Sequence, residues 1–238
     1  MDWDALQQKA SRRERAKDAR RQALLESARR LLGEDDLSMR RIAEGAGLSP
    51  ATPYNLFGSK RRLFQTLHRK QMQQLAARID LLESLDPLDR IFAALDSIVD
   101  EVRDFKAFYA ELFNLVYLQA DRTQRVESDD EDSLWIDPGI VFWTELFETA
   151  QAAGHLRADA NAELIARNVF RLLTGLIVEW LEGRIDIDHW RHAAHAGIAL
   201  WAIAATEPKH EACLRQRLRD AEAALATIAA DTDTRNAA

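Results

Sequence analysis

The chain has 238 residues, of which 47% are hydrophobic and 30% charged, with a formal net charge of −7. This composition is typical of a globular protein that buries an apolar core. Its single cysteine, Cys213, excludes an internal disulfide and a cysteine-based zinc cluster. No apolar run reaches the roughly 18 residues of a membrane-spanning helix, and the first residues lack the apolar stretch of a signal peptide, so we expect a cytoplasmic protein.

Glycine and proline are scarce, at nine and five residues, whereas Ala, Leu, Arg, Glu and Gln are abundant. These five residues are good helix formers, and a β sandwich or barrel would need more turn residues. The composition therefore predicts an all-α fold.

Charge is unevenly distributed along the chain. Residues 1–70 hold 16 of the 32 Lys and Arg but only 9 of the 39 Asp and Glu, a net charge of +7, and the rest of the chain carries −14. Neutralisation of phosphates supplies most sequence-independent affinity for nucleic acid, so a basic module joined to an acidic one suggests DNA binding by the first part. A merely solvated charged surface is the alternative.

The chain opens with a basic arm over residues 5–21, which has seven basic and two acidic side chains and is expected to be flexible or partly helical. From Arg20 to Leu32 the apolar residues recur with the spacing of an amphipathic helix. Ser38 is expected to cap a short helix from Met39 to Ala46, and Gly47 to allow a left-handed turn.

A third helix is predicted to end at about Phe57. Ser49 is a natural N-cap and Pro50 suits the first helical position. Pro53 conflicts with that start because it lacks an N–H, whereas a helix capped by Thr52 would shrink to about one turn. We favour Ser49 as the cap, with a distorted first turn.

Further helices follow along the rest of the chain. A long helix is predicted from Lys60 to about Leu82, and helical patterns then cover about 88–105, 107–119, 139–153, 160–183, 188–206 and 210–229. Pro, Gly and acidic residues mark the breaks, and residues 121–133 form an acidic loop.

The two short helices have the pattern of a helix-turn-helix, in the sequence SMRRIAEGAGLSPATPYNLF. Ile42, Ala43, Leu48 and Phe57 are predicted to face inward and Ser49, Ala51, Thr52 and Asn55 outward. The small residues Ala43, Gly45 and Gly47 would let the helices approach closely. The second helix could then enter a major groove, although a purely structural hairpin has the same spacing.

The run from Arg20 through Phe64 resembles the N-terminal DNA-binding domain of TetR-family transcriptional regulators. The motifs that carry the resemblance are L-x-x-A-R-x-L-L-G, S-M-R-R-I-A and A-G-L-S-P-A-T-P-Y-N-L-F-G-S-K. It implies a basic arm and helix-turn-helix DNA-binding domain over 1–66 and a helical effector-binding and dimerisation domain over 67–238.

The resemblance also implies roles for single residues. Tyr54 and Lys60 would bind phosphates, Ser38 would reach the DNA backbone, and Thr52 and Asn55 would hydrogen-bond to base edges. The implied DNA-binding set is Ser38, Arg40, Ser49, Pro50, Ala51, Thr52, Tyr54, Asn55 and Lys60.

The helices after residue 100 are rich in aromatic residues, which usually form core, but the family's effector pocket lies among these helices. The implied pocket residues are Phe105, Tyr109, Phe113, Asn114, Tyr117, Trp143, Phe147 and Arg171.

The helix predicted over 160–183 is apolar around most of its circumference, and the helix over 188–206 has small residues that permit close helix approach. The resemblance makes this pair a dimer interface, and a buried hairpin in a monomer would explain it as well. The implied interface residues are Leu172, Leu176, Trp180, Trp190, Ala194, Gly197, Ile198 and Trp201.

Other chemistry has little support in the sequence. His189, His192 and His195 are spaced by three on one helix and could approach a metal, but no thiolate or obvious carboxylate accompanies them, so we predict no metal and leave this point open. No Ser, Cys or Lys has a recognisable paired base, so we expect neither an enzyme nor a cofactor.

The sequence therefore predicts a ligand-responsive, homodimeric repressor that binds a palindromic operator in double-stranded DNA and is released by a small hydrophobic effector. One alternative is an all-α small-molecule binding protein or enzyme with an incidental helical hairpin. Another is a dimeric interaction module that no longer binds DNA, because Pro53 and Leu56 depart from the family pattern.

Overall fold

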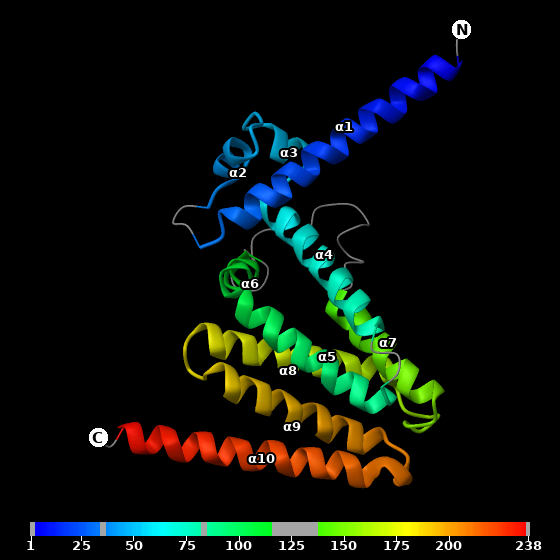
Figure 1. The fold of residues 1–238 in the computed structure, drawn as a ribbon, viewed down its shortest axis with the longest axis vertical. Coiled ribbons are helices and arrows are strands. Elements are labelled where there is room, and N and C mark those ends of the chain that lie inside the picture. The colour runs from blue at the N-terminus through cyan, green and yellow to red at the C-terminus, as the bar shows by residue number, and fades with distance from the viewer. Residues whose placement is uncertain (1–2, 34–36, 82–84, 116–137, 237–238) are drawn as a thin grey trace, which may run out of the picture. The chain divides into compact units, whose positions relative to one another are not determined.

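A computed structural model of the chain describes residues 3–33, 37–81, 85–115 and 138–236 (Figure 1). These residues form ten helices and no strand, which confirms the all-α prediction. The helices are α1 (Trp3–Arg30), α2 (Met39–Gly45), α3 (Thr52–Phe57), α4 (Lys60–Asp80), α5 (Pro87–Asp104), α6 (Lys106–Phe113), α7 (Pro138–Ala152), α8 (Ala162–Leu181), α9 (Ile187–Ala205) and α10 (Pro208–Asn236).

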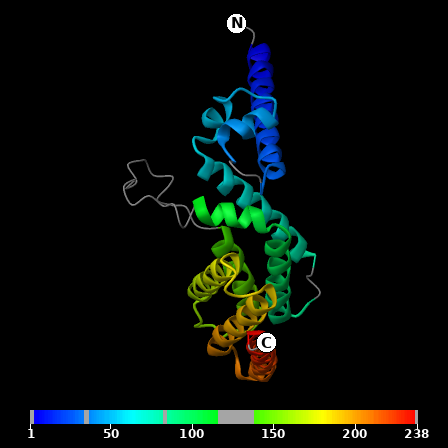
Figure 2. The ribbon, with the colours of Figure 1, turned by 90° about the vertical axis from the view of Figure 1, so that its left-hand side faces the viewer.

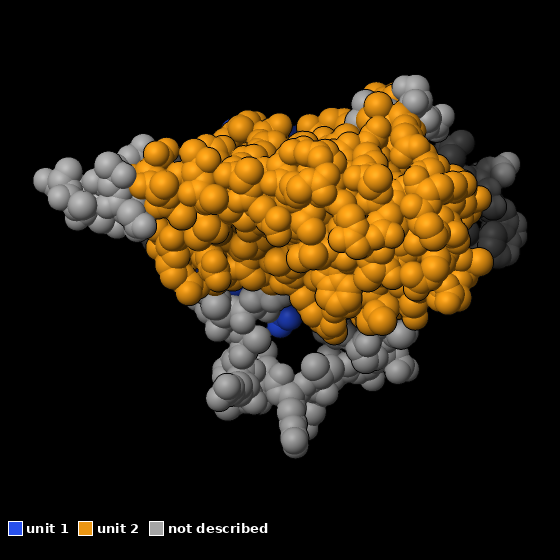
Figure 3. All heavy atoms as spheres, turned by 90° about the horizontal axis from the view of Figure 1, so that it is seen from below, with its two compact units in different colours: residues 1–70, 107–123 blue, residues 71–106, 124–238 orange. Residues whose placement is uncertain are grey.

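The chain divides into two compact units. Unit 1 contains residues 1–70 and 107–123, and unit 2 contains residues 71–106 and 124–238, drawn in orange in Figure 3. Helix α4 therefore begins in unit 1 and ends in unit 2, and nearly all of α6 belongs to unit 1. The units are not contiguous in sequence, unlike the predicted domains over 1–66 and 67–238.

Unit 1 is built around the packing of α1, α2, α3 and the first half of α4. Leu24, Ile42, Leu63 and Phe64 are completely buried in its core. Helix α6 joins this core because the rings of Phe64 and Phe108 stack with their centroids 5.8 Å apart. A helix that the sequence placed among the effector-binding helices thus supports the unit that carries the helix-turn-helix.

Helix α1 is longer than the sequence predicted. The apolar pattern indicated a helix from Arg20, whereas α1 is continuous from Trp3 and its N-terminal half runs beyond α2 and α3 (Figures 1 and 2). The preceding segment is rich in Ala, Arg, Lys and Gln and contains no Gly or Pro, so its helix propensity is high. Apolar periodicity misses this half because residues 12–16 are exposed.

Unit 2 contains the end of α4 with α5 and α7 to α10. Helices α8 and α9 pack together, and α10 runs along α9 (Figure 1). Phe92, Trp143, Phe147 and Trp190 are almost completely buried in its core. None of the described helices is both long enough and apolar enough to cross a membrane.

Side-chain caps place three helix starts in unit 2 close to their predicted positions. The Asp86 carboxylate accepts a hydrogen bond from the Leu88 N–H at 2.9 Å. Asn161 and Asp186 cap α8 and α9 in the same way, at 2.8 and 2.7 Å. The acidic loop predicted at 121–133 lies outside the described residues.

Candidate nucleic-acid interface

The first helix of the predicted helix-turn-helix is α2, and Ser38 caps it as expected. Ser38 has an extended backbone, with φ −119° and ψ 158°, and its Oγ accepts a hydrogen bond of 3.4 Å from the N–H three residues later. Ile42 and Ala43 are buried, whereas Arg40 is exposed with its Nε 3.6 Å from a Glu44 carboxylate oxygen. Helix α2 therefore has an apolar inner side and a charged outer side.

The turn after α2 depends on Gly47. Its φ is +66°, the left-handed conformation that glycine adopts without strain. The Gly47 N–H donates to the Glu44 carbonyl at 3.0 Å and the Leu48 N–H to the Ala43 carbonyl at 2.9 Å. This pair of bonds is a Schellman motif, which ends the helix and redirects the chain toward α3.

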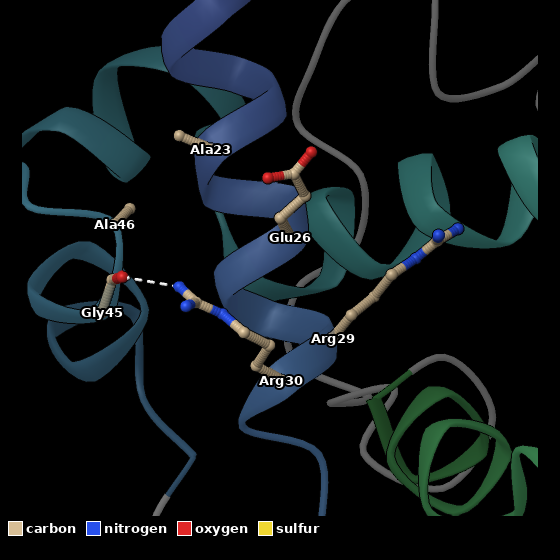
Figure 4. Close-up of a pocket in the computed structure, with 6 residues that line it drawn as sticks. All are labelled: Ala23, Glu26, Arg29, Arg30, Gly45 and Ala46. Atoms are coloured by element: carbon tan, nitrogen blue, oxygen red, sulfur yellow. Dashed lines mark hydrogen bonds between the residues drawn. The ribbon is translucent and has the colours of Figure 1, made fainter.

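Gly45 allows a close approach, but to α1 rather than to the second helix of the motif. A Cβ at Gly45 would overlap the Oγ of Ser27. The Arg30 guanidinium donates to the Gly45 carbonyl at 2.8 Å, at the negative end of the α2 dipole (Figure 4). A hollow of about 460 Å³ beside this contact is lined by Ala23, Glu26, Arg29, Arg30, Gly45 and Ala46, none of them predicted pocket residues.

Helix α3 begins later than the sequence predicted. Its first residue is Thr52 and its N-cap is Ala51, so the expectation that Ser49 caps it is wrong. The Thr52 N–H donates to the Ser49 carbonyl at 2.9 Å and closes a turn, and the Asn55 N–H donates to the Ala51 carbonyl at 3.0 Å. Pro53 has no N–H, so the turn at Ser49 cannot continue as a helix through it.

The residues around the start of α3 form a mainly polar surface, which we call the α3 surface, and all of them are exposed except Thr52, which is partly exposed. The α3 surface consists of Ser49, Pro50, Ala51, Thr52, Tyr54 and Asn55. Tyr54 is 55% exposed, and the Ser49 and Thr52 hydroxyl oxygens lie 2.8 Å apart. Pro53 and Phe57, by contrast, are buried. The α3 surface can therefore offer hydroxyl, phenol and amide groups to a partner while its base is fixed in the core.

Lys60, the first residue of α4, is engaged within unit 1. Its Nζ lies 2.6 Å from a carboxylate oxygen of Glu111 on α6 and also donates to the Leu37 carbonyl. The Lys60 side chain is only 24% exposed. Because Leu37 immediately precedes Ser38, the N-terminal ends of α2 and α4 are adjacent. The sequence could not reveal Glu111 as the partner because no local pattern relates residues so far apart.

The Arg21 side chain connects α1 to α3, a role that the sequence did not reveal. Its guanidinium donates to the Leu56 carbonyl at 3.1 Å and lies 5.7 Å from the centroid of the Phe57 ring. The only signal for Arg21 in the sequence was its position at the end of the basic arm. The contact fixes the direction of α3 relative to α1.

A family model described as bacterial regulatory proteins of the tetR family matches residues 24–67, the segment that contains the capped α2, the Schellman turn and the α3 surface. The chain therefore resembles TetR-family regulators over this segment. It is 27% identical over 171 residues to the HTH-type transcriptional repressor KstR2 of Mycobacterium tuberculosis, a match that covers 68% of this chain and 82% of KstR2.

Solved structures with the same fold include two proteins crystallised with ligands. The complex of RolR with resorcinol has a TM-score of 0.61 and 17% identity, and the match covers 86% of this chain and 95% of RolR. The complex of Thermus thermophilus FadR, a TetR-family repressor, with lauroyl-CoA has a TM-score of 0.63 and 15% identity, covering 76% of this chain and 92% of FadR. At these identities the likeness establishes the fold alone.

The predicted pocket residues fall in both units. In unit 2, Trp143 and Phe147 on α7 are buried, while Phe105 after α5 is exposed. Arg171 on α8 is exposed and donates to the Asn168 side-chain oxygen at 3.2 Å.

The remaining predicted pocket residues belong to unit 1. Tyr109 and Phe113 on α6 are buried, and the Tyr109 ring lies edge-on to His68 with 6.4 Å between centroids. Asn114 is partly exposed. Tyr117 lies outside the described residues. The effector pocket therefore stays a prediction.

The predicted dimer residues separate into two groups by burial. Four are buried within unit 2, namely Trp180, Trp190, Ala194 and Ile198. The other four are partly or fully exposed, namely Leu172, Leu176, Gly197 and Trp201. A Cβ on Gly197 would overlap the Leu172 side chain, so this glycine permits α8 and α9 to approach within one chain. The first group therefore serves the core of the protomer itself.

Two of the three histidines of α9, His192 and His195, lie in an ionic cluster with α5. His195 Nε2 lies 3.0 Å from an Asp96 carboxylate oxygen, and Arg191 donates to the same oxygen at 2.6 Å. Burial opposes ionisation of Asp96, but the hydrogen bonds and charges of His195 and Arg191 outweigh it and lower its pKa. Burial and the His195 charge also lower the pKa of His192. The described residues contain no group of three or more potential metal ligands.

Proposed function

We propose that this chain is a non-enzymatic, ligand-responsive transcriptional repressor that acts in the cytoplasm. Residues 1–66 serve as the DNA-binding domain and residues 67–238 as the effector-binding and dimerisation domain. The observation that carries the proposal is the α3 surface, a set of exposed polar groups at the start of a helix whose other side is buried. Its position after a capped α2 and a Schellman turn is the arrangement that places a recognition helix in a major groove.

Roles on DNA follow from the position of each side chain. Thr52 and Asn55 on the α3 surface carry groups that can hydrogen-bond to base edges, and Ala51 can contact a thymine methyl group. Tyr54 is exposed enough for its hydroxyl to reach a phosphate. Lys60 can bind phosphate when it exchanges the Glu111 carboxylate for DNA.

Ser38, Arg40, Ser49 and Pro50 complete the proposed contact surface. Arg40 is exposed, and its ion pair with Glu44 is of the weak kind that a phosphate can displace. Ser38 caps α2 and can approach the DNA backbone from that helix end.

The test is binding of the chain to the DNA that flanks its own gene, measured by fluorescence anisotropy and footprinting. Wild-type protein should protect a two-fold symmetric site, and Thr52→Ala with Asn55→Ala should lose roughly 1–3 kcal/mol of discrimination for each base that they read. Affinity for random DNA should change little. The matched control is Thr227→Ala, on α10. Absence of sequence-specific binding by the wild type would refute the proposal.

Dimerisation is proposed through an apolar face of α8 and α9. Leu164 is 52% exposed, Leu200 56% and Trp201 41%, and Ala204 is exposed beside them on α9. Exposed large apolar residues on adjacent helices indicate a protein contact. A second copy of the chain would bury this face and present two recognition helices to the half-sites of a palindrome.

A small hydrophobic effector is proposed to control DNA binding through α4. This helix belongs to both units, with Lys60 beside the DNA-binding helices and Asp80 in unit 2. A ligand that stabilises one position of α4 could thereby change the spacing of the recognition helices. A 100-fold loss of operator affinity requires about 2.7 kcal/mol of differential binding, which burial of a modest apolar area can supply.

Thermodynamic linkage between effector binding and DNA binding provides the test of this effector mechanism. A compound that releases the operator must bind the DNA-bound dimer more weakly than the free dimer by the same factor. Equal calorimetric affinities for the two forms would eliminate that compound as the effector. Substitutions at Trp143 and Phe147 should alter induction if the pocket lies beside α7.

A further inference from the structure

One side of α1 changes from apolar to basic along the helix. Leu24 and Ala28 lie on this side and are completely buried in unit 1. Arg13, Lys17 and Arg20 continue it toward the N-terminus at spacings of four, three and four residues, so they share one face of the helix. We call these three residues the basic stripe.

The basic stripe is available to a partner of opposite charge. Arg13 and Arg20 are exposed, and Lys17 is partly exposed with its Nζ 3.5 Å from a Glu14 carboxylate oxygen. An exposed ion pair of this kind contributes at most about 1 kcal/mol, so a phosphate can replace it. Arg20 Nε donates to the carbonyl four residues earlier in α1, which leaves its charge exposed. Glu14 and Asp18 lie about 100° or more around the helix from the middle of the stripe.

The stripe is positioned relative to the α3 surface by Arg21. Its contacts with the Leu56 carbonyl and the Phe57 ring hold α1 against α3 at the point where α1 leaves the core. Arg13 lies eight residues beyond this point, about 12 Å further along the helix. Figure 2 shows the N-terminal half of α1 running past α2 and α3. By helical spacing the stripe continues the side of α1 on which Leu24 and Ala28 are buried.

We propose that the basic stripe binds the phosphate backbone of double-stranded DNA just outside the half-site that the α3 surface reads. The inference rests on the proposed function. An α-helix about 10–12 Å in diameter does not fit the minor groove, which is about 6 Å wide, so the stripe contacts phosphates rather than minor-groove base edges. Because the segment is already helical, the three charges meet the backbone together, as a rigid extension of the recognition unit.

The decisive variant is the triple substitution Arg13→Gln, Lys17→Gln and Arg20→Gln, which removes three charges and keeps a good helix former at each position. Each lost phosphate contact should reduce the salt slope of binding by about 0.9, hence by about 2 to 3 per subunit. Affinity for operator and random DNA should fall by the same factor. Hydroxyl-radical footprints should lose protection at both outer edges and keep it at the half-sites.

Two further variants distinguish binding by the basic stripe from a general effect of net charge and from binding by a flexible arm. The control Lys209→Gln, Arg215→Gln and Arg219→Gln removes the same charge from exposed positions of α10 and should leave slope and footprint unchanged. Ala16→Pro keeps the stripe's charges but breaks α1, and it should lose the outer protection as the triple variant does. Circular dichroism and melting of each variant verify that the core of unit 1 is folded.

The possible outcomes distinguish this inference from the proposed function. An unchanged slope and footprint in the triple stripe variant would overturn the inference, as would an equal loss in the α10 control. If Ala16→Pro keeps the outer protection, the basic stripe does not need a continuous α1 to reach the phosphates, and the claim of a rigid extension would be wrong. A wild-type chain that shows no sequence-specific binding would refute the proposed function itself.

Discussion

The start of α3 and the paired helices α8 and α9 expose opposite chemistry. Around Thr52 the exposed side chains carry hydroxyl, phenol and amide groups, and the apolar residues Pro53 and Phe57 are inside. On α8 and α9 apolar residues lie on both sides, with Trp190 buried and Leu200 exposed. A mainly polar exposed surface suits a polar, charged partner, whereas an exposed apolar face suits another protein chain.

The two regions also differ in what stabilises their helices. Helices α2 and α3 have seven and six residues, too short to be stable alone, so the core of unit 1 and the cap of α2 must hold them. Helices α8 and α9 have 20 and 19 residues and pack against each other along their length. Small local changes should therefore damage the first region, whereas the second should tolerate changes that do not disturb its packed sides.

The largest effect is expected from a charge on the apolar face. Leu200→Arg should prevent dimerisation, because a buried unpaired charge costs several kcal/mol, and operator affinity should fall by about 100-fold or more when one recognition helix remains. Sedimentation and anisotropy measure the two effects. Ala226→Arg, on an exposed position of α10, is the matched control. A Leu200→Arg dimer with normal DNA binding would place the interface elsewhere.

The close contact between α1 and α2 gives the next effect. Gly45→Ala should lower the free energy of unfolding by roughly 1–3 kcal/mol, because its Cβ overlaps the Ser27 Oγ. That hydroxyl is buried and has no hydrogen-bond partner among the described residues, and the Cβ atoms of the two positions would lie 3.7 Å apart. Ser27→Ala should therefore rescue Gly45→Ala in chemical denaturation. Additive losses in the double variant would contradict the overlap.

The ion pair at the start of α4 should produce a smaller change, and a gain. Glu111→Gln removes the carboxylate that competes with phosphate for Lys60, so operator affinity should rise several-fold, or by about 1 kcal/mol. Random DNA should gain equally because the contact is to phosphate. The effect should vanish in a Lys60→Met background, measured by anisotropy at constant salt. A gain that persists without Lys60 would show that Glu111 acts by another route.

The smallest effect concerns pH and unit 2. The rings of His155 and His210 stack with centroids 4.0 Å apart, and burial together with the charge of His155 lowers the pKa of His210. The folded state then binds fewer protons than the unfolded state near pH 6, so the melting temperature should fall as pH drops below about 6.5. His210→Gln should weaken this dependence without abolishing it, because the pKa of His192 is lowered as well. An unchanged profile would remove His210 as a contributor.

Local sequence determined most of the secondary structure and the position of the candidate site. Ser38 caps its helix where the pattern placed it, and Gly47 adopts the predicted left-handed turn. These features depend on residues only a few positions apart, whose hydrogen bonds form within one or two turns. The exposed residues of the α3 surface were likewise predictable, because a helix with a known inner side also has a known outer side.

Only the tertiary structure decided how distant residues meet. The Lys60 amine pairs with Glu111, and Gly197 makes room for Leu172 in the same chain. Local rules left the start of α3 between caps at Ser49 and Thr52. The structure takes neither, because Ala51 is the N-cap and Pro53 is buried just inside the helix. Periodicity shows which side of a helix is apolar but not what covers it, because the covering residues come from elsewhere in the chain or from another molecule.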